Sequence, residues 1–167
     1  MKISPVFAVL IIVLFCGALF TGCSSVITGP ARSTYSTEAI ELDNKGFDAF
    51  TGGNNETALS YYNQALAADP AYTRAWINKG DLLARLNRSE EAVASYDAAL
   101  SLEPELPLVL NSRGEALMSL GRYNDALDSF EKAVSYAPEF TEAKENRDAA
   151  RLKIQGAAAG GATTGTK

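Results

Sequence analysis

Three acidic residues, Asp43, Asp81 and Glu115, are the side chains whose spacing could bring several charges to one surface. Carboxylates that face each other can act as general acid and base or hold a metal ion. The chain has no histidine, which removes the commonest general base and the commonest neutral metal ligand. It also has no glycine-rich phosphate loop to support catalysis. We therefore expect a solvated acidic face, with no enzyme activity, no cofactor and no metal.

The two cysteines, Cys16 and Cys23, lie in or beside an apolar segment at the start of the sequence. Lys2 precedes an almost wholly apolar run from Val6 to Phe20, a pattern typical of an export signal. The segment ends Phe20-Thr21-Gly22-Cys23, which resembles a lipobox, with Phe20 where leucine is usual. This resemblance implies that the thiol of Cys23 carries a diacylglyceryl group and that residues 1–22 are removed.

Two other interpretations of residues 1–22 stay open. The apolar run has close to the ~20 residues that span a bilayer, so it could be an uncleaved anchor helix. It could also be a cleaved signal that releases the protein. Residues 23–37 are rich in Ser and Thr and predict a flexible spacer. Residues 156–167, GAAAGGATTGTK, predict a disordered tail with some residual helix near 157–159.

Two tripeptides, Asn55-Glu56-Thr57 and Asn87-Arg88-Ser89, fit the acceptor pattern for N-linked glycans. Both lie in predicted turns, where asparagine is common because it tolerates turn backbone conformations. Asn55 and Asn87 are therefore candidate glycosylation sites, with a purely structural role in the turn as the alternative.

A spacing of 34 residues is kept across the middle of the chain. It relates five sets of similar residues: Gly46, Gly80 and Gly114; Ala58, Ala92 and Ala126; Tyr62, Tyr96 and Phe130; Ala65, Ala99 and Ala133; Pro70, Pro104 and Pro138. A period of this length indicates stacked units, each too small to bury its own core. Such arrays present a binding surface, and the period does not identify the ligand.

Each unit is predicted to be two helices joined by a turn. We expect the prolines to open the helix that follows, with Asp69 as a cap before Pro70. The turns contain residues that tolerate positive φ, namely Gly52-Gly53, Asn87 and Gly121. A glycine inside a helix costs roughly 0.5–1 kcal/mol relative to alanine. Three glycines at one spacing, in the first helix of each unit, therefore predict a close approach of the second helix.

The pattern resembles the tetratricopeptide repeat. Trp76, Gly80, Ala92, Tyr96 and Pro104 fall on that family's large, glycine, alanine, aromatic and proline positions. The resemblance implies an all-α, right-handed curved solenoid over residues 38–155, with seven helices. Its parts would be repeats at about 39–72, 73–106 and 107–140 and a capping helix at 139–155, whose Phe140, Ala143, Ala150 and Ile154 line one side.

In this family the first helix of each repeat lines the concave surface. The resemblance therefore predicts a partner-binding groove formed by Asp43, Phe47, Phe50, Arg74, Ile77, Asp81, Asn111, Glu115 and Met118, with Ile40, Ala84 and Leu108 beside them. Apolar side chains among them suit a peptide or an amphipathic helix. Some members bind a C-terminal carboxylate with Lys, Asn and Arg. Here only Asn78 matches that set, so such a clamp is disfavoured.

The sequence thus predicts a scaffold that is tethered to a membrane, faces outside the cytoplasm in the cell envelope, and binds a protein or peptide. It would be secreted if the signal were cleaved without lipidation. The net charge of −5 argues against nucleic acid as a partner. Two alternatives stay open: a small-ligand receptor or enzyme accessory that uses the acidic groove, and a homo-oligomeric structural protein of the envelope.

Overall fold

A computed structural model describes residues 35–162, with side chains described up to residue 158. This part of the chain is all-helical and contains no strand. Its seven helices are α2 (Thr37–Thr51), α3 (Asn55–Ala68), α4 (Thr73–Arg85), α5 (Ser89–Leu102), α6 (Pro107–Ser119), α7 (Tyr123–Tyr136) and α8 (Thr141–Ala162). The predictions for residues 1–34, including the signal, the lipobox and Cys23, lie outside the described residues.

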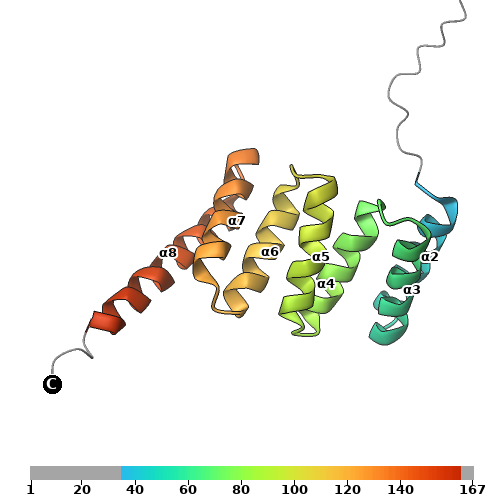
Figure 1. The fold of residues 1–167 in the computed structure, drawn as a ribbon, viewed down its shortest axis with the longest axis horizontal. Helices are drawn as coiled ribbons and strands as arrows, with labels where there is room; N and C mark the ends of the chain where they lie inside the picture. The colour runs from blue at the N-terminus through green and yellow to red at the C-terminus, as the bar shows by residue number, and fades with distance from the viewer. Residues whose placement is uncertain (1–34, 163–167) are drawn as a thin grey trace, which may run out of the picture. The chain divides into compact units, whose positions relative to one another are not determined.

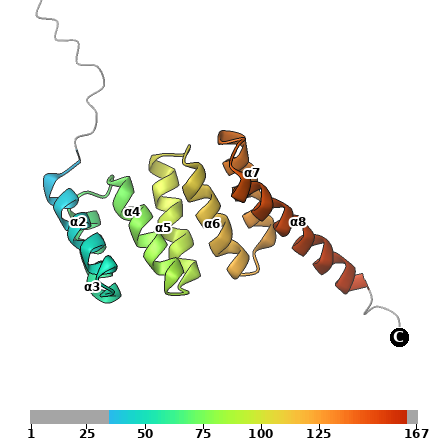
Figure 2. The ribbon, with the colours of Figure 1, turned by 180° about the vertical axis from the view of Figure 1, so that it is seen from behind.

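The helices form three pairs and a final single helix. Helix α2 packs on α3, α4 on α5 and α6 on α7, and each pair packs on the next. The pairs stand side by side in a row, as Figures 1 and 2 show from opposite sides. Helix α8 packs on α6 and α7 and then continues beyond them. The predicted solenoid of three helix pairs and a capping helix is confirmed.

The prolines do not open the helices as predicted, because α4, α6 and α8 each begin three residues after one of them. The residue before each proline, namely Asp69, Glu103 or Ala137, has φ between −149° and −132° and ψ between 82° and 96°. Proline sterically excludes the helical conformation from the residue before it. The prolines therefore end the second helix of each pair. The Asp69 carboxylate caps no helix: it accepts from the backbone N–H groups of Ala71 and Ser36, at 3.0 Å each.

The turns inside the pairs behave as predicted. Gly53, Asn87 and Gly121, which are 34 residues apart, have φ values of 81°, 57° and 72°. In each turn the next residue donates its N–H to a carbonyl of the preceding helix, as Arg88 does to Leu83 at 2.9 Å. This left-handed ending satisfies helix carbonyls that would otherwise lack a donor.

At Gly46, Gly80 and Gly114, an aromatic ring from the second helix of the same pair occupies the space where a side chain would be. A Cβ atom on Gly80 would lie 2.6 Å from Cε1 of Tyr96, and Gly46 meets Tyr62 in the same way. The close approach is confirmed, and the ring itself fills the space at the glycine. Tyr96 is 1% exposed, and alanines such as Ala92 and Ala99 are fully buried around it.

Both ends of the helical unit differ from prediction. Tyr35 and Ser36 belong to the fold and not to a flexible spacer, since the Tyr35 ring lies 4.9 Å from that of Tyr72. At the other end, α8 continues to Ala162, past the predicted helix end at 155 and the residual helix predicted near 157–159. Phe140, Ala143, Ala150 and Ile154 are buried or half-buried, as predicted. Among residues 35–162, no helix has the length and apolarity needed to cross a membrane.

Candidate functional site

The surface formed by the first helices of the repeats contains a hollow of about 600 Å³, here called the central hollow. It extends over α2, α4, α5 and α6, and therefore over all three repeats. Its lining consists of Phe50, Asp81, Ala84, Arg85, Asn87, Ser89, Tyr96, Ser112, Glu115, Ala116 and Ser119. Three predicted groove residues, Phe50, Asp81 and Glu115, thus come together here, with Ala84 beside them.

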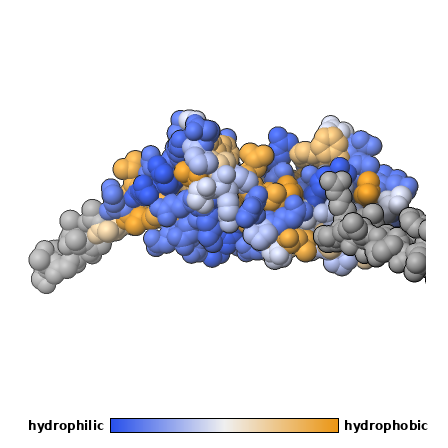
Figure 3. Space-filling model, turned by 90° about the horizontal axis from the view of Figure 1, so that it is seen from above, coloured by the Kyte–Doolittle hydropathy of each residue, from blue (hydrophilic) through white to orange (hydrophobic). Residues whose placement is uncertain are grey.

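A second hollow of about 400 Å³, the N-terminal hollow, takes up two other predicted groove residues, Arg74 and Ile77. It is lined by Tyr35, Ile40, Tyr72, Thr73, Arg74, Ile77 and Glu103. Phe47 and Leu108 line neither hollow and are 53% and 71% exposed. Viewed from above, the surface is largely hydrophilic and its hydrophobic residues lie in small separate groups (Figure 3). Scattered apolar residues of this kind are normal on a soluble protein surface.

Asp43 does not face the groove as predicted, because it is 1% exposed and lies between α2 and α4. Its carboxylate accepts from Nε of Arg74 at 2.7 Å and from Nδ2 of Asn78 at 2.8 Å. The hydroxyl of Tyr72 donates to it at 3.5 Å. Burying a carboxylate is costly unless it is paired and hydrogen-bonded, and here it is both. Asp43 joins the first two repeats, and Asn78, the one residue that matched a carboxylate clamp, is used in that contact.

Two further predicted groove residues belong to the packing. Met118 is half-buried against the main hydrophobic core. Asn111 is 4% exposed and donates from Nδ2 to Oε1 of Glu115 at 2.9 Å. From α8, Nδ2 of Asn146 donates to the same oxygen at 2.9 Å and to Oδ1 of Asn111 at 3.0 Å. Asn111 and Met118 therefore belong to the packing and to the hydrogen bonds around Glu115, and they do not line the hollow.

Asp81 is the acidic group at the centre of the central hollow. The Tyr96 hydroxyl donates to its Oδ1 at 2.8 Å. The residue is exposed to water, yet it lies in a hollow with protein on several sides. This partial loss of solvent raises the pKa of Asp81, against the opposing effects of the Tyr96 hydrogen bond and of Arg85. Burial and the nearby Asp81 carboxylate raise the pKa of the Tyr96 hydroxyl, which therefore stays protonated as a donor.

Glu115 occupies the same place one repeat further along. Burial raises its pKa, and the amide donors Asn146 and Asn111 oppose the shift. The one cationic side chain in the lining is Arg85, whose guanidinium lies 5.1 Å from the centre of the Phe50 ring. That distance is typical of a cation–π contact. The central hollow thus combines two carboxylates, one arginine held against an aromatic ring, and several hydroxyl groups.

Comparison with known families agrees with this architecture. Models of the tetratricopeptide repeat match residues 44–107 and 107–140, which together exceed half of the chain. The chain is a tetratricopeptide repeat protein. No match was found among proteins whose functions have been curated.

Solved structures of other tetratricopeptide repeat domains share the fold. The first such domain of Spaghetti (RPAP3), bound to the HSP90 peptide SRMEEVD, is 22% identical with a TM-score of 0.69, and the match covers 72% of this chain and 95% of that one. The second domain of human RPAP3, in complex with the HSP70 peptide SGPTIEEVD, is 25% identical (TM-score 0.65; 68% and 95% covered). The TPR2B domain of yeast Sti1 in a pHsp70 complex is 22% identical (TM-score 0.65; 71% and 99% covered).

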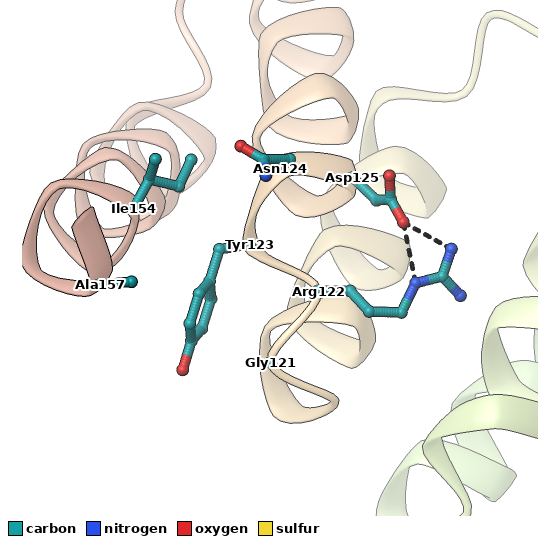
Figure 4. A pocket seen from close by; sticks show the side chains of 7 residues that line it. All are labelled: Gly121, Arg122, Tyr123, Asn124, Asp125, Ile154 and Ala157. Carbon is teal, nitrogen blue, oxygen red and sulfur yellow. Dashed lines mark hydrogen bonds and ion pairs between the residues drawn. The ribbon is translucent and has the colours of Figure 1, made fainter. Parts of the chain in front are cut away.

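A further hollow of about 300 Å³ lies at the end of the tetratricopeptide repeats, between the start of α7 and the far part of α8. Figure 4 shows Tyr123 and Ile154 lining it, while Arg122 and Asp125 pair with each other, Nε to Oδ2 at 2.8 Å. Ala157 completes the lining. Ala157 lies beyond the predicted helix end at 155, so the prediction did not place it at this hollow.

The structure shows no metal site in the described residues of this tetratricopeptide repeat protein. No group of three or more Cys, Asp or Glu side chains within residues 35–162 could hold a metal ion. Asp43, Asp81 and Glu115 each belong to a separate hydrogen-bond network. Of the two candidate glycosylation sites, Asn55 is the first residue of α3 and Asn87 is exposed in its turn.

Sequence reasoning missed several hollow residues of the repeats, among them Arg85, Tyr96 and Ser119. Tyr96 belongs to the aromatic set that repeats every 34 residues, and its ring is buried. Its hydroxyl nevertheless reaches the groove surface at Asp81. The sequence carried one signal of this role: Tyr96 has a hydroxyl group, whereas Phe130 at the equivalent position of the next repeat has none.

Proposed function

We propose that this chain is a membrane-tethered scaffold whose central hollow holds a peptide or helical segment of a partner protein. The observation that carries the proposal is the hollow itself: about 600 Å³ lined by side chains of all three repeats. That volume lies in the range of protein ligand sites. The proposal assigns no catalytic step and no cofactor to the chain.

The form of the central hollow favours an elongated ligand. Its lining comes from helices that succeed one another along the stack, so a segment lying across them would touch each repeat. The lining combines the apolar residues Phe50, Ala84 and Ala116 with hydroxyl and carboxylate groups. Such a mixture suits a peptide, which offers both side chains and a polar backbone. The peptides bound by the RPAP3 domains, which share the fold, support this class of ligand.

The tether is the second part of the proposal. It rests on the export-type segment at residues 1–22 and on Cys23, which the resemblance to a lipobox makes the lipidated residue. Lipid at Cys23 would place the helical unit in the cell envelope, outside the cytoplasm. Cys23→Ala should release the protein from membranes or block its processing. If that variant fractionates with membranes at the mature size, lipidation at Cys23 is refuted.

Blocking the hollow tests the binding function. Ser119 lines the hollow, and Ser135 on α7 lies outside all the hollows described above; each is exposed and donates its hydroxyl to a backbone carbonyl of its own helix. The assay crosslinks the full chain to its partner protein in native membranes and purifies the two together. We expect Ser119→Trp to lose that partner. Ser135→Trp should retain it. Retention by both variants would exclude the central hollow as the binding site.

A further inference from the structure

We infer that the central hollow selects a segment that carries a lysine or arginine side chain, whose cationic group is held by Asp81 and Glu115. This inference rests on the proposed function and specifies the charge of its partner. Asp81 and Glu115 are 34 residues apart, at the same position of neighbouring repeats. Both line the central hollow.

Both carboxylates are held in place by neutral donors. Tyr96 donates to Oδ1 of Asp81 at 2.8 Å, and Asn111 and Asn146 donate to Oε1 of Glu115 at 2.9 Å each. Among the described residues, no N–H or hydroxyl group donates to Oδ2 of Asp81 or to Oε2 of Glu115, and the nearby Glu142 carboxyl adds to the rise in the pKa of Glu115. Each group therefore keeps one oriented oxygen that can accept from a ligand.

Six other carboxylates of the helical unit are paired with arginine. Asp43 pairs with Arg74, and the other five acids that pair with arginine are Glu91, Asp97, Asp125, Glu131 and Asp148. No lysine or arginine of residues 35–158 forms an ion pair with Asp81 or Glu115. Asp81 and Glu115 therefore line the central hollow without an ion-pair partner among these residues.

Arg85 does not neutralise the central hollow. Its guanidinium lies against the Phe50 ring and makes no ion pair with Asp81. Two carboxylates and one guanidinium leave the lining with an excess of negative charge. Burial raises the pKa of both acids, and an incoming cation would oppose that shift. An acidic ligand residue at the same place would meet like charge and lose affinity.

The test uses the full chain, solubilised in mild detergent and immobilised. Four pools of synthetic heptapeptides with randomised flanks carry Lys, Arg, Leu or Glu at the centre, and affinity selection with mass spectrometry measures retention. The variant Asp81→Asn/Glu115→Gln removes both acids. The control Asp128→Asn/Glu105→Gln makes the same change of charge at exposed residues outside the central hollow.

We expect the Lys and Arg pools to be retained about tenfold more than the Leu and Glu pools, as charge-assisted hydrogen bonds would give. The hollow variant should lose this preference and the control should keep it. If all pools are retained equally, or the Glu pool is preferred, the charge inference is overturned. If Ser119→Trp then abolishes that retention, the proposed function still stands. Retention of no pool would overturn both. A Lys and Arg preference that survives Asp81→Asn/Glu115→Gln would also overturn the inference.

Discussion

Replacing Gly80 with alanine tests the packing on which the repeats depend. In an open helix the change should stabilise the fold by about 0.5–1 kcal/mol. At Gly80, however, the new Cβ would lie 2.6 Å from Cε1 and 2.8 Å from Cδ1 of Tyr96. The ring is 1% exposed and its hydroxyl is bonded to Asp81, so it has little room to move. Overpacking of this kind costs about 1–3 kcal/mol.

Subtracting the gain in helix propensity leaves an expected net loss of about 1–2 kcal/mol for Gly80→Ala. Urea unfolding of residues 35–167, followed by far-ultraviolet circular dichroism, measures it. Gly156→Ala in α8 is the control, because a Cβ there meets nothing within 4 Å; it should stabilise. In a Tyr96→Ala background, Gly80→Ala should no longer destabilise. If Gly80→Ala stabilises as much as Gly156→Ala, the account of the glycine and aromatic contact is refuted.

Three further predictions concern the same unit. Asp43→Ala should lower stability by about 1–3 kcal/mol, because Asn78 and Arg74 lose their buried acceptor; an unchanged thermal melt would contradict the bridging role. Burial first, and then the nearby Asp43 carboxylate, raise the pKa of Tyr62 to about 12. An unfolded tyrosine has a pKa of about 10, so the free energy of unfolding falls as the pH rises from about 10 to 12, where the unfolded Tyr62 ionises and the folded one does not. Tyr62→Phe should therefore resist alkaline unfolding better than the parent, and identical alkaline transitions would argue against this assignment. Asn87→Ala should cost about 1–2 kcal/mol, since Asn87 has φ of 57°, whereas Asn87→Gly should be tolerated; equal denaturation midpoints for the two variants would refute the turn argument.

The 34-residue period was sufficient to predict the repeats, because each repeated residue type has a local steric role. Gly80 must lack a side chain where a ring is buried, and Asn87 must adopt positive φ. These requirements act within one repeat and are therefore visible in the sequence. The same reasoning was wrong for Pro70, because a proline can begin one helix or end another. Here Pro70 excludes the helical conformation from the residue before it and so ends the preceding helix.

The groove was predicted less well than the fold, because its lining depends on contacts between helices. The resemblance to the family placed Asp43 on the groove side, but Arg74 and Asn78, 31 and 35 residues later, bind its carboxylate and bury it. The extent of α8 was missed for a different reason. Its alanines favour helix strongly enough to continue it across Gly156, although the composition predicted disorder.

The most direct test of the account is a photo-crosslink from within the central hollow. A benzophenone side chain would replace Ser112, which lines the hollow, or Ser101, which is exposed at the end of α5 and lies outside it. After illumination of native membranes, mass spectrometry would identify the attached peptides. We predict that Ser112 gives adducts to one segment of a partner protein and that Ser101 does not. Adducts from Ser101 alone, or the same adducts from both positions, would contradict the claim that the central hollow is the binding site.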